Sequence, residues 1–190
     1  SPLTSFMGAL HTLREVPEDR SLERVERDLV ETAIRSVKRM VKLLDDYLSV
    51  AKLEAGLMPL RSDAVEVAPL VARCVEQAAA AARARGIAVA VEIQAPQGLR
   101  IRADPDLLLR VVQNLLDNAL QYAAERGRVE IRATEETDYA QLSVNDDGPG
   151  IAPQEVERVF ERYYQSSGPG HPRRGGTGLG LAFCREALRA

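Results

Sequence analysis

Apolar residues recur at intervals of three and four along the first third of the chain. No Gly or Pro interrupts this spacing between Ser21 and Ala55, so the pattern predicts one helix roughly 50 Å long with an apolar stripe. A shorter segment from Leu3 to Leu13 has the same spacing, and Pro17 separates the two. With Ser21 as N-cap, the segment is predicted to be a helical hairpin. The stripe of its long helix consists of Leu22, Val25, Leu29, Ala33, Val37, Met40, Leu44, Tyr47 and Ala51.

Two helices bury too little apolar surface to be stable by themselves. We therefore expect a second copy of the chain to complete a four-helix bundle as a homodimer. Gly56 is expected to end the long helix, and the following residues up to Leu60 have the composition of a hinge. The chain is thus predicted to divide into a helical hairpin, residues 1–56, and a second domain, residues 57–190.

Beyond the hinge the apolar pattern changes to alternating helices and strands, which predicts an α+β fold. Asp104 is placed to cap a helix that has Pro105 in its first turn. The short segment 99–102 is expected to pair with the strand before it. The predicted helices cover residues 67–85 and 104–124 and a last segment that includes residues 182–188, and the predicted strands cover residues 87–93, 99–102, 128–134 and 139–144.

The composition narrows the classes of function. Hydrophobic residues make up 45% of the chain and charged residues 28%, which is ordinary for a globular protein. A net charge of -3 provides no basic field for a phosphate backbone, so nucleic acid is not an expected partner. There is no apolar run long enough for a membrane span and no signal peptide at Ser1, so we expect no membrane contact within this chain and a cytoplasmic location, including the cytoplasmic part of a membrane-anchored sensor. Cys74 and Cys184 are expected to be two buried thiols rather than a disulfide.

Asn114 and Asn118 are four residues apart and therefore share one face of a predicted helix. Amide oxygens are hard, neutral ligands that can share Mg²⁺ with phosphate groups. The alternative is that both are surface polar residues, and this pair alone does not exclude it. The opposite, apolar face of the helix consists of Leu108, Val111, Val112, Leu115, Leu116 and Ala119.

A second motif lies where a predicted strand runs into Asp146-Asp147-Gly148-Pro149-Gly150. Glycines let the backbone turn tightly against a ligand. A buried carboxylate at a strand end can accept a hydrogen bond from an exocyclic amine such as that of adenine. The alternative is an ordinary acidic turn.

A third motif, Gly175 to Gly180, leads glycines into a helix. Backbone N–H groups and the positive end of the helix dipole make such a junction suitable for phosphate. It is not a dinucleotide fingerprint, because a Gly- and Pro-rich segment precedes it instead of a strand, and it lacks the Gly-Lys-Ser/Thr of a P-loop. The alternative for this motif is a flexible linker, but a linker would not continue into Leu179-Gly180-Leu181 and an amphipathic helix. The flanking residues from Gln165 to Arg174 are interpreted as a mobile lid.

The order of these motifs resembles the ATP-binding domain shared by histidine kinases, Hsp90 chaperones, MutL proteins and type II topoisomerases. The resemblance is closest to sensor histidine kinases of two-component systems, because Val159–Tyr164 resembles their phenylalanine box and Ser1–Thr4 resembles the end of their histidine box. It implies a dimerising hairpin followed by a Bergerat-type two-layer α/β sandwich with a mixed sheet. It also implies Mg²⁺ and ATP as cofactors, phosphorylation of a histidine, and transfer to an aspartate of a response-regulator receiver domain.

The same resemblance implies roles for the matching residues. Asn114 and Asn118 would hold Mg²⁺ and the phosphates, Tyr122 would flank the adenine, and Asp146 would accept a hydrogen bond from its amino group. Gly148 and Gly150 would let the chain pass close to the base. Arg162 is a candidate for phosphate contact, as are Arg173 and Arg174. The loop expected to close over the phosphates contributes Gly176, Thr177, Gly178, Leu179 and Gly180.

The sequence departs from the family pattern at both ends. The phosphoacceptor histidine would precede Ser1 by four positions, and neither His11 nor His171 matches it. The chain as given is therefore expected to bind ATP without phosphorylating itself, and no residue in it is assigned as catalytic. Family strands are expected beyond Ala190, and without them the strand 139–144 is expected to be an open edge. Gln121 stands where the family often has Lys.

Two other functions remain open. One is a different enzyme of the same superfamily, such as an anti-sigma serine kinase; the long hairpin and the end of the histidine box argue against it. The other is a non-catalytic signalling scaffold in which the nucleotide only sets conformation.

Overall fold

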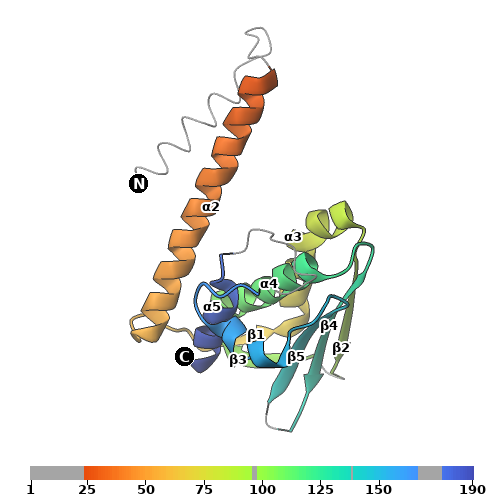
Figure 1. Cartoon of the computed structure of the whole chain (residues 1–190). Helices are drawn as coiled ribbons and strands as arrows, with labels where there is room; N and C mark the ends of the chain where they lie inside the picture. Colours follow the sequence, from red (N-terminus) through yellow and green to blue (C-terminus); the bar gives the residue numbers. More distant parts are fainter. Residues whose placement is uncertain (1–23, 96–97, 138, 167–176) are drawn as a thin grey trace. The chain divides into compact units, whose positions relative to one another are not determined.

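The structure is a computed structural model that describes residues 24–95, 98–137, 139–166 and 177–190 (Figure 1). It divides into two compact units, Ser1–Ser49 and Val50–Ala190. The predicted short helix from Leu3 to Leu13 and the predicted cap Ser21 lie outside the described residues.

One long helix, α2 (Arg24–Glu54), confirms the predicted uninterrupted rod. Gly56 ends it in the left-handed conformation, with φ +64. The N–H of Leu57 then donates to the carbonyl of Lys52 at 2.9 Å, which satisfies one of the last helical carbonyls. None of the described helices has the length and apolar character needed to span a bilayer.

The apolar stripe of α2 is only partly covered. Ile34 and Val37 are buried, whereas a second set of apolar side chains at helical spacing is 43–52% exposed. This set consists of Met40, Leu44, Tyr47 and Leu48, and three of its four members belong to the predicted stripe.

The unit from Val50 onward contains the mixed α and β elements. Two very short 3-10 helices, η1 and η2, follow the last strand. The elements in chain order are β1 (Asp63–Glu66), α3 (Val67–Arg85), β2 (Ala88–Gln94), β3 (Arg100–Ala103), α4 (Pro105–Tyr122), β4 (Arg128–Glu135), β5 (Ala140–Asp146), η1 (Pro153–Glu155), η2 (Arg158–Phe160) and α5 (Gly180–Arg189).

The main sheet has the order β2-β4-β5, with β2 parallel to β4 and β4 antiparallel to β5. Val129, Ile131 and Ala133 alternate along β4 and are fully buried, as period-2 packing of one sheet face requires. Helices α3 and α4 pack over this face (Figure 1). The mixed sheet under a layer of helices confirms the predicted α+β sandwich, and β5 is an edge strand among the described residues.

The predicted pairing of segment 99–102 was wrong. β3 pairs with β1 in a separate two-stranded antiparallel sheet, in which Val65 lies opposite Ile101, and not with β2. The N–H of Val67 also donates to the carbonyl of Leu99 at 2.9 Å. β1 was not predicted, because a four-residue strand with one buried side chain, Val65, has no readable alternation.

Both cysteines are free and buried, as expected. The Cys74 thiol lies 3.8 Å from the carbonyl oxygen of Leu109, and the Cys184 thiol lies 3.7 Å from that of Val111. Burial raises the pKa of Cys74 to about 11.

Candidate functional site

Helix α4 carries three of the predicted nucleotide-binding residues. Its inner face consists of Leu109, Val112, Leu116, Ala119 and Leu120, all buried against the sheet and α3. Asn114, Asn118 and Tyr122 recur every four residues on another face and are half-buried. One helix thus presents two amides and an aromatic ring in a row.

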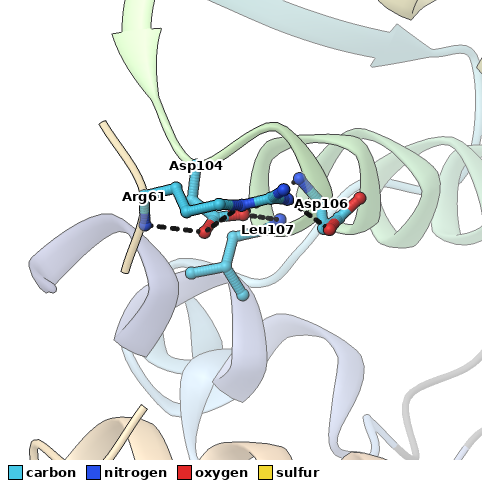
Figure 2. A network of polar contacts seen from close by, with 4 residues as sticks. All are labelled: Arg61, Asp104, Asp106 and Leu107. Atoms are coloured by element: carbon cyan, nitrogen blue, oxygen red, sulfur yellow. Dashed lines mark hydrogen bonds and ion pairs between the residues drawn. The ribbon is translucent and has the colours of Figure 1, made fainter. Parts of the chain in front are cut away.

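The start of α4 is fixed by the side chain of Asp104. Its Oδ1 accepts hydrogen bonds from the N–H groups of Asp106 and Leu107 at 3.0 and 3.1 Å, which confirms the predicted N-cap. Its Oδ2 accepts a third from the N–H of Arg61 at 3.0 Å (Figure 2). The Arg61 guanidinium pairs with Asp106 at 2.5 Å, so the segment after α2 is attached to the first turn of α4.

These contacts also set the charge state of Asp104. The N–H of Arg61 is the largest cause that lowers the pKa of this carboxyl below its ordinary value, followed by the N–H groups of Leu107 and Asp106; partial burial opposes them.

Asn114 lies against the start of α5. A Cβ added at Gly180 would be 3.3 Å from Asn114 Oδ1, so any larger residue would need this side chain to shift by a few tenths of an ångström. Asn114 Nδ2 is buried and has no hydrogen-bond partner of normal geometry in the part of the chain that is described. An unpaired buried amide nitrogen is rare in folded proteins, and a bound ligand or water would complete its hydrogen bonding.

Next to Asn114, burial raises the pKa of the Cys184 thiol to about 12, and the Asn114 amide and the Arg110 guanidinium offset part of this rise. The guanidinium of Arg110 lies 4.1 Å from the ring centre of Phe183, which is fully buried. α5 therefore packs on the same helix that carries the asparagines.

The second motif lies where β5 ends. Asp146 is exposed, not buried as expected, and its Oδ1 accepts a hydrogen bond from the N–H of Gly148 at 2.8 Å. A Cβ at Gly148 would lie 2.6 Å from the carbonyl oxygen of Tyr122, so this turn packs directly on the end of α4. Gly150 has φ +72 and open space around its Cβ position, so only the backbone conformation favours glycine there.

The third motif is described from Thr177 onward; Gly176, Arg173, Arg174 and the predicted lid from residue 167 onward lie outside the described residues. The Thr177 hydroxyl accepts a hydrogen bond from the N–H of Leu179 at 3.2 Å. Leu179 is fully buried and precedes α5, whose first residue is Gly180. The loop thus places the N-terminus of α5 next to Asn114.

Gly178 is packed against the predicted phenylalanine box. Its carbonyl accepts a hydrogen bond from the N–H of Tyr163 at 2.8 Å. A Cβ on Gly178 would lie 2.7 Å from the Cα and carbonyl carbon of Tyr163, and the φ of Gly178 is +70. Tyr163 itself has φ 62, which is uncommon for a residue with a side chain.

Arg162 forms an ion pair with Glu54, in the last turn of α2. Both residues belong to the unit that starts at Val50, and their side chains are 30% and 37% exposed. Close by in sequence, the Tyr164 hydroxyl donates to Glu155 at 2.5 Å. The pairing of Arg162 was not predicted, because Glu54 is far from it in sequence.

The contacts bring the predicted residues into two groups. Asn114 meets Gly180 at one end, and Tyr122 meets the Asp146–Gly148 turn at the other, with Asn118 between them on the same helix. Three residues that contact these segments were not predicted from the sequence: Asp147, Arg85 and Glu54. Asp147 could have been noticed as a second carboxylate in the turn; the other two carry no local signal.

Two family models match the chain. Residues 103–190 match the histidine kinase-, DNA gyrase B- and HSP90-like ATPase domain, which defines the class of the larger unit. Residues 1–56 match the His Kinase A (phospho-acceptor) domain. The second match distinguishes histidine kinases from the other members of that class.

Individual relatives support the same family assignment. The chain is 29% identical over its whole length to the alginate biosynthesis sensor protein KinB of Pseudomonas aeruginosa, of which it covers 31%. It is similar to full-length ShkA crystallised with AMPPNP, at 26% identity and a TM-score of 0.77, covering 99% of this chain and 40% of ShkA. It also resembles the mycobacterial sensor histidine kinase MprB, at 31% identity and a TM-score of 0.56, covering 67% of this chain and 78% of the MprB chain.

The chain belongs to the sensor histidine kinases. It spans between 31% and 50% of the length of the first curated relatives that it matches. Its domains are the phosphoacceptor-type helical domain and the ATP-binding catalytic domain of that family.

Proposed function

We propose that the chain binds Mg-ATP in a site between the α4 face bearing Asn114, Asn118 and Tyr122, the Asp146–Gly150 turn and the loop from Gly176 to Gly180. The observation that carries this proposal is the Nδ2 atom of Asn114, which is buried and has no hydrogen-bond partner of normal geometry among the described residues, while Oδ1 of the same side chain lies near the Gly180 position. Glycine at a helix start beside a polar amide fits a phosphate group. Thr177 and Leu179 also belong to this loop and to the proposed site.

The side chains available as metal ligands suit Mg²⁺ only if phosphate oxygens also bind the ion. The described residues include no cluster of three or more His, Cys, Asp or Glu side chains that could hold a metal ion. Two half-buried amides, Asn114 and Asn118, supply few ligands, which suits Mg²⁺ because this ion keeps waters and takes phosphate oxygens. When bound, the ion would neutralise charge on the phosphates.

The adenine would lie at the other end of α4. Tyr122 offers a half-buried aromatic surface, and the exposed Asp146 carboxylate can accept a hydrogen bond from an exocyclic amino group. Arg162 would reach the phosphates after exchanging its partner Glu54.

In the whole protein, we propose autophosphorylation of a histidine upstream of Ser1 and transfer of the phosphoryl group to the aspartate of a response-regulator receiver domain. The exposed row Met40, Leu44, Tyr47 and Leu48 on α2 supports a homodimer, because a second copy would cover these apolar side chains. We propose residues 1–56 as the dimerisation and phosphotransfer domain and residues 57–190 as the catalytic domain. Family membership supports the reaction.

A radiolabel transfer assay on the full-length protein tests the proposed reaction. Incubation with γ-labelled ATP and Mg²⁺ is expected to give acid-labile, base-stable label on the protein, which passes to a receiver domain. Asn118→Ala in the same chain is expected to prevent labelling. Binding of ATP without any label transfer would contradict the kinase proposal and favour the scaffold.

A further inference from the structure

The two ends of the proposed nucleotide site come from elements that are distant in sequence. Tyr122 ends α4, and Asp146 ends β5. The backbone of Gly148 approaches the carbonyl of Tyr122 so closely that a Cβ would be 2.6 Å from its oxygen. The residues that hold this contact between the turn and α4 therefore set the distance between the Tyr122 ring and the Asp146 carboxylate.

The side chain of Asp147 bridges this junction. Its Oδ1 accepts a hydrogen bond from the N–H of Ala124 at 3.1 Å, and its Oδ2 accepts one from the N–H of Arg128 at 2.9 Å. A Cβ on Gly127 would lie 2.4 and 2.5 Å from the two carboxylate oxygens. The loop between α4 and β4 therefore wraps around the carboxylate, and glycine at 127 provides the space for it.

The positively charged side chain of Arg85 also stabilises this end of α4. α4 has no glycine cap; its cap residue is Ala123, with an extended ψ of 149. The Arg85 guanidinium, from the last turn of α3, donates instead to the carbonyls of Leu120, Gln121 and Ala123, the last two at 3.0 and 2.8 Å. A cation at the carbonyl end of a helix is also favourable for the helix dipole.

The adjacent carboxylates of Asp146 and Asp147 have different hydrogen-bond partners. Asp146 bonds within its own turn, to the N–H of Gly148, whereas Asp147 bonds to two backbone donors that follow α4. Hydrogen bonds from N–H groups to an ionised carboxylate are stronger than those between neutral groups. Loss of Asp147 frees the end of α4 relative to the turn that carries Asp146.

We propose that Asp147 is a positioning residue of the nucleotide site, which fixes Tyr122 against Asp146 without touching the ligand. This inference rests on the proposed binding of ATP at these residues. Displacements near 1 Å are enough to weaken a site that depends on several groups acting together. Two variants test this positioning role. Asp147→Ala removes both acceptor oxygens, whereas Asp147→Asn keeps one acceptor oxygen and the shape of the side chain.

The experiment measures ATP affinity in Mg²⁺ by displacement of a fluorescent ATP analogue, well below the unfolding temperature. Asp147→Ala is expected to weaken binding on the order of tenfold, and Asp147→Asn less, because one of the two hydrogen bonds remains. Glu125→Ala is the matched control: it removes the same charge from an exposed residue of the same loop and is expected to leave affinity unchanged. Amide hydrogen exchange of Ala124 and Arg128 reports the junction directly, and protection there is expected to fall in step with affinity.

The outcomes are distinguishable. Folded Asp147→Ala that binds ATP as tightly as wild type overturns this inference alone, as does lost affinity with unchanged protection of Ala124 and Arg128. Wild type that binds no ATP overturns the proposed function and the inference with it. If Asp147→Ala does not fold, Asp147→Asn decides, with partial loss of both affinity and protection as the expected result and wild-type values for both as the contradicting one.

Discussion

Arg162, one of the arginines proposed to contact the phosphates, is ion-paired with Glu54 in the last turn of α2. A guanidinium engaged by a carboxylate must exchange that partner before it can bind phosphate, and the exchange costs part of the binding free energy. Because both side chains are about one-third exposed, water screens the pair, and its contribution is modest, about 0–1 kcal/mol.

We therefore expect Glu54→Gln to strengthen ATP binding about two- to fivefold, as a released pair of this kind allows, and Arg162→Ala to weaken it. Titration of a fluorescent ATP analogue measures both. Glu161→Gln is the control, because Glu161 is exposed and adjacent to Arg162. Weaker binding by Glu54→Gln than by wild type would show that the pair supports the site instead of competing with it.

Asp104 provides a prediction about stability. Asp104→Ala removes the cap of α4 and the bond to Arg61, and is expected to cost about 1–2 kcal/mol of unfolding free energy. Asp104→Asn is expected to cost less, because Asn also caps helices well. Urea unfolding measures both, and Asp106→Asn, at an exposed side chain, is expected to change little. Equal costs for Asp104→Ala and Asp106→Asn would contradict the role of the cap.

The same residue gives a pH dependence. The folded pKa of Asp104 is lowered, so its ionised form is favoured by folding. Its stabilising contribution is complete above the unfolded pKa, about 3.9, and is lost as the pH falls through the lower folded pKa. The stability difference between wild type and Asp104→Asn should be constant from neutral pH down to about pH 5 and shrink below about pH 4. A difference that grows on acidification would have the wrong sign.

Two glycines form a matched pair for a prediction about backbone strain. Gly150 and Gly178 have nearly the same φ, +72 and +70, but only Gly178 faces backbone atoms, those of Tyr163 at 2.7 Å. Gly150→Ala is expected to cost about 1 kcal/mol through backbone strain alone, and Gly178→Ala clearly more, because backbone cannot move aside cheaply. Urea unfolding compares the two variants, and equal costs would show that the Tyr163 contact is not rigid.

The helices were predictable because their signals are local. The long rod of α2, its end at Gly56, and the start of α4 at Asp104 and Pro105 each follow from spacing, caps and breakers within a few residues. The partner of β3 was not predictable in the same way, since β1 lies 34 or more residues upstream and contains one buried side chain. Strand pairing is a tertiary property.

The same distinction applies to the site. Its motif residues could be proposed from their types, their order and their resemblance to the ATP-binding domain of histidine kinases. The residues that hold the motifs in place act through contacts between distant segments: Asp147 with the loop after α4, Arg85 with the end of α4, and Glu54 with Arg162. The positive φ of Tyr163, whose backbone lies beside Gly178, likewise has no signal in its residue type.

The two thiols give a prediction about chemical labelling. Burial raises the pKa of Cys184 to about 12 and that of Cys74 to about 11, so neither is ionised at pH 8. Since the thiolate is the reactive form, iodoacetamide is expected to label neither in the folded protein and both after unfolding in guanidinium. Mass spectrometry counts the labels. Fast labelling of Cys184 in the folded protein would contradict its burial beside Asn114.

The central claim is that the two amides of α4 bind ATP through Mg²⁺, and calorimetric titration of ATP tests it most directly. The account predicts one site per chain whose affinity falls strongly when Mg²⁺ is removed by a chelator, and a comparable loss in folded Asn118→Ala with Mg²⁺ present. Folded wild type that takes up no ATP, or that binds it equally with and without Mg²⁺ and with and without Asn118, would contradict the account.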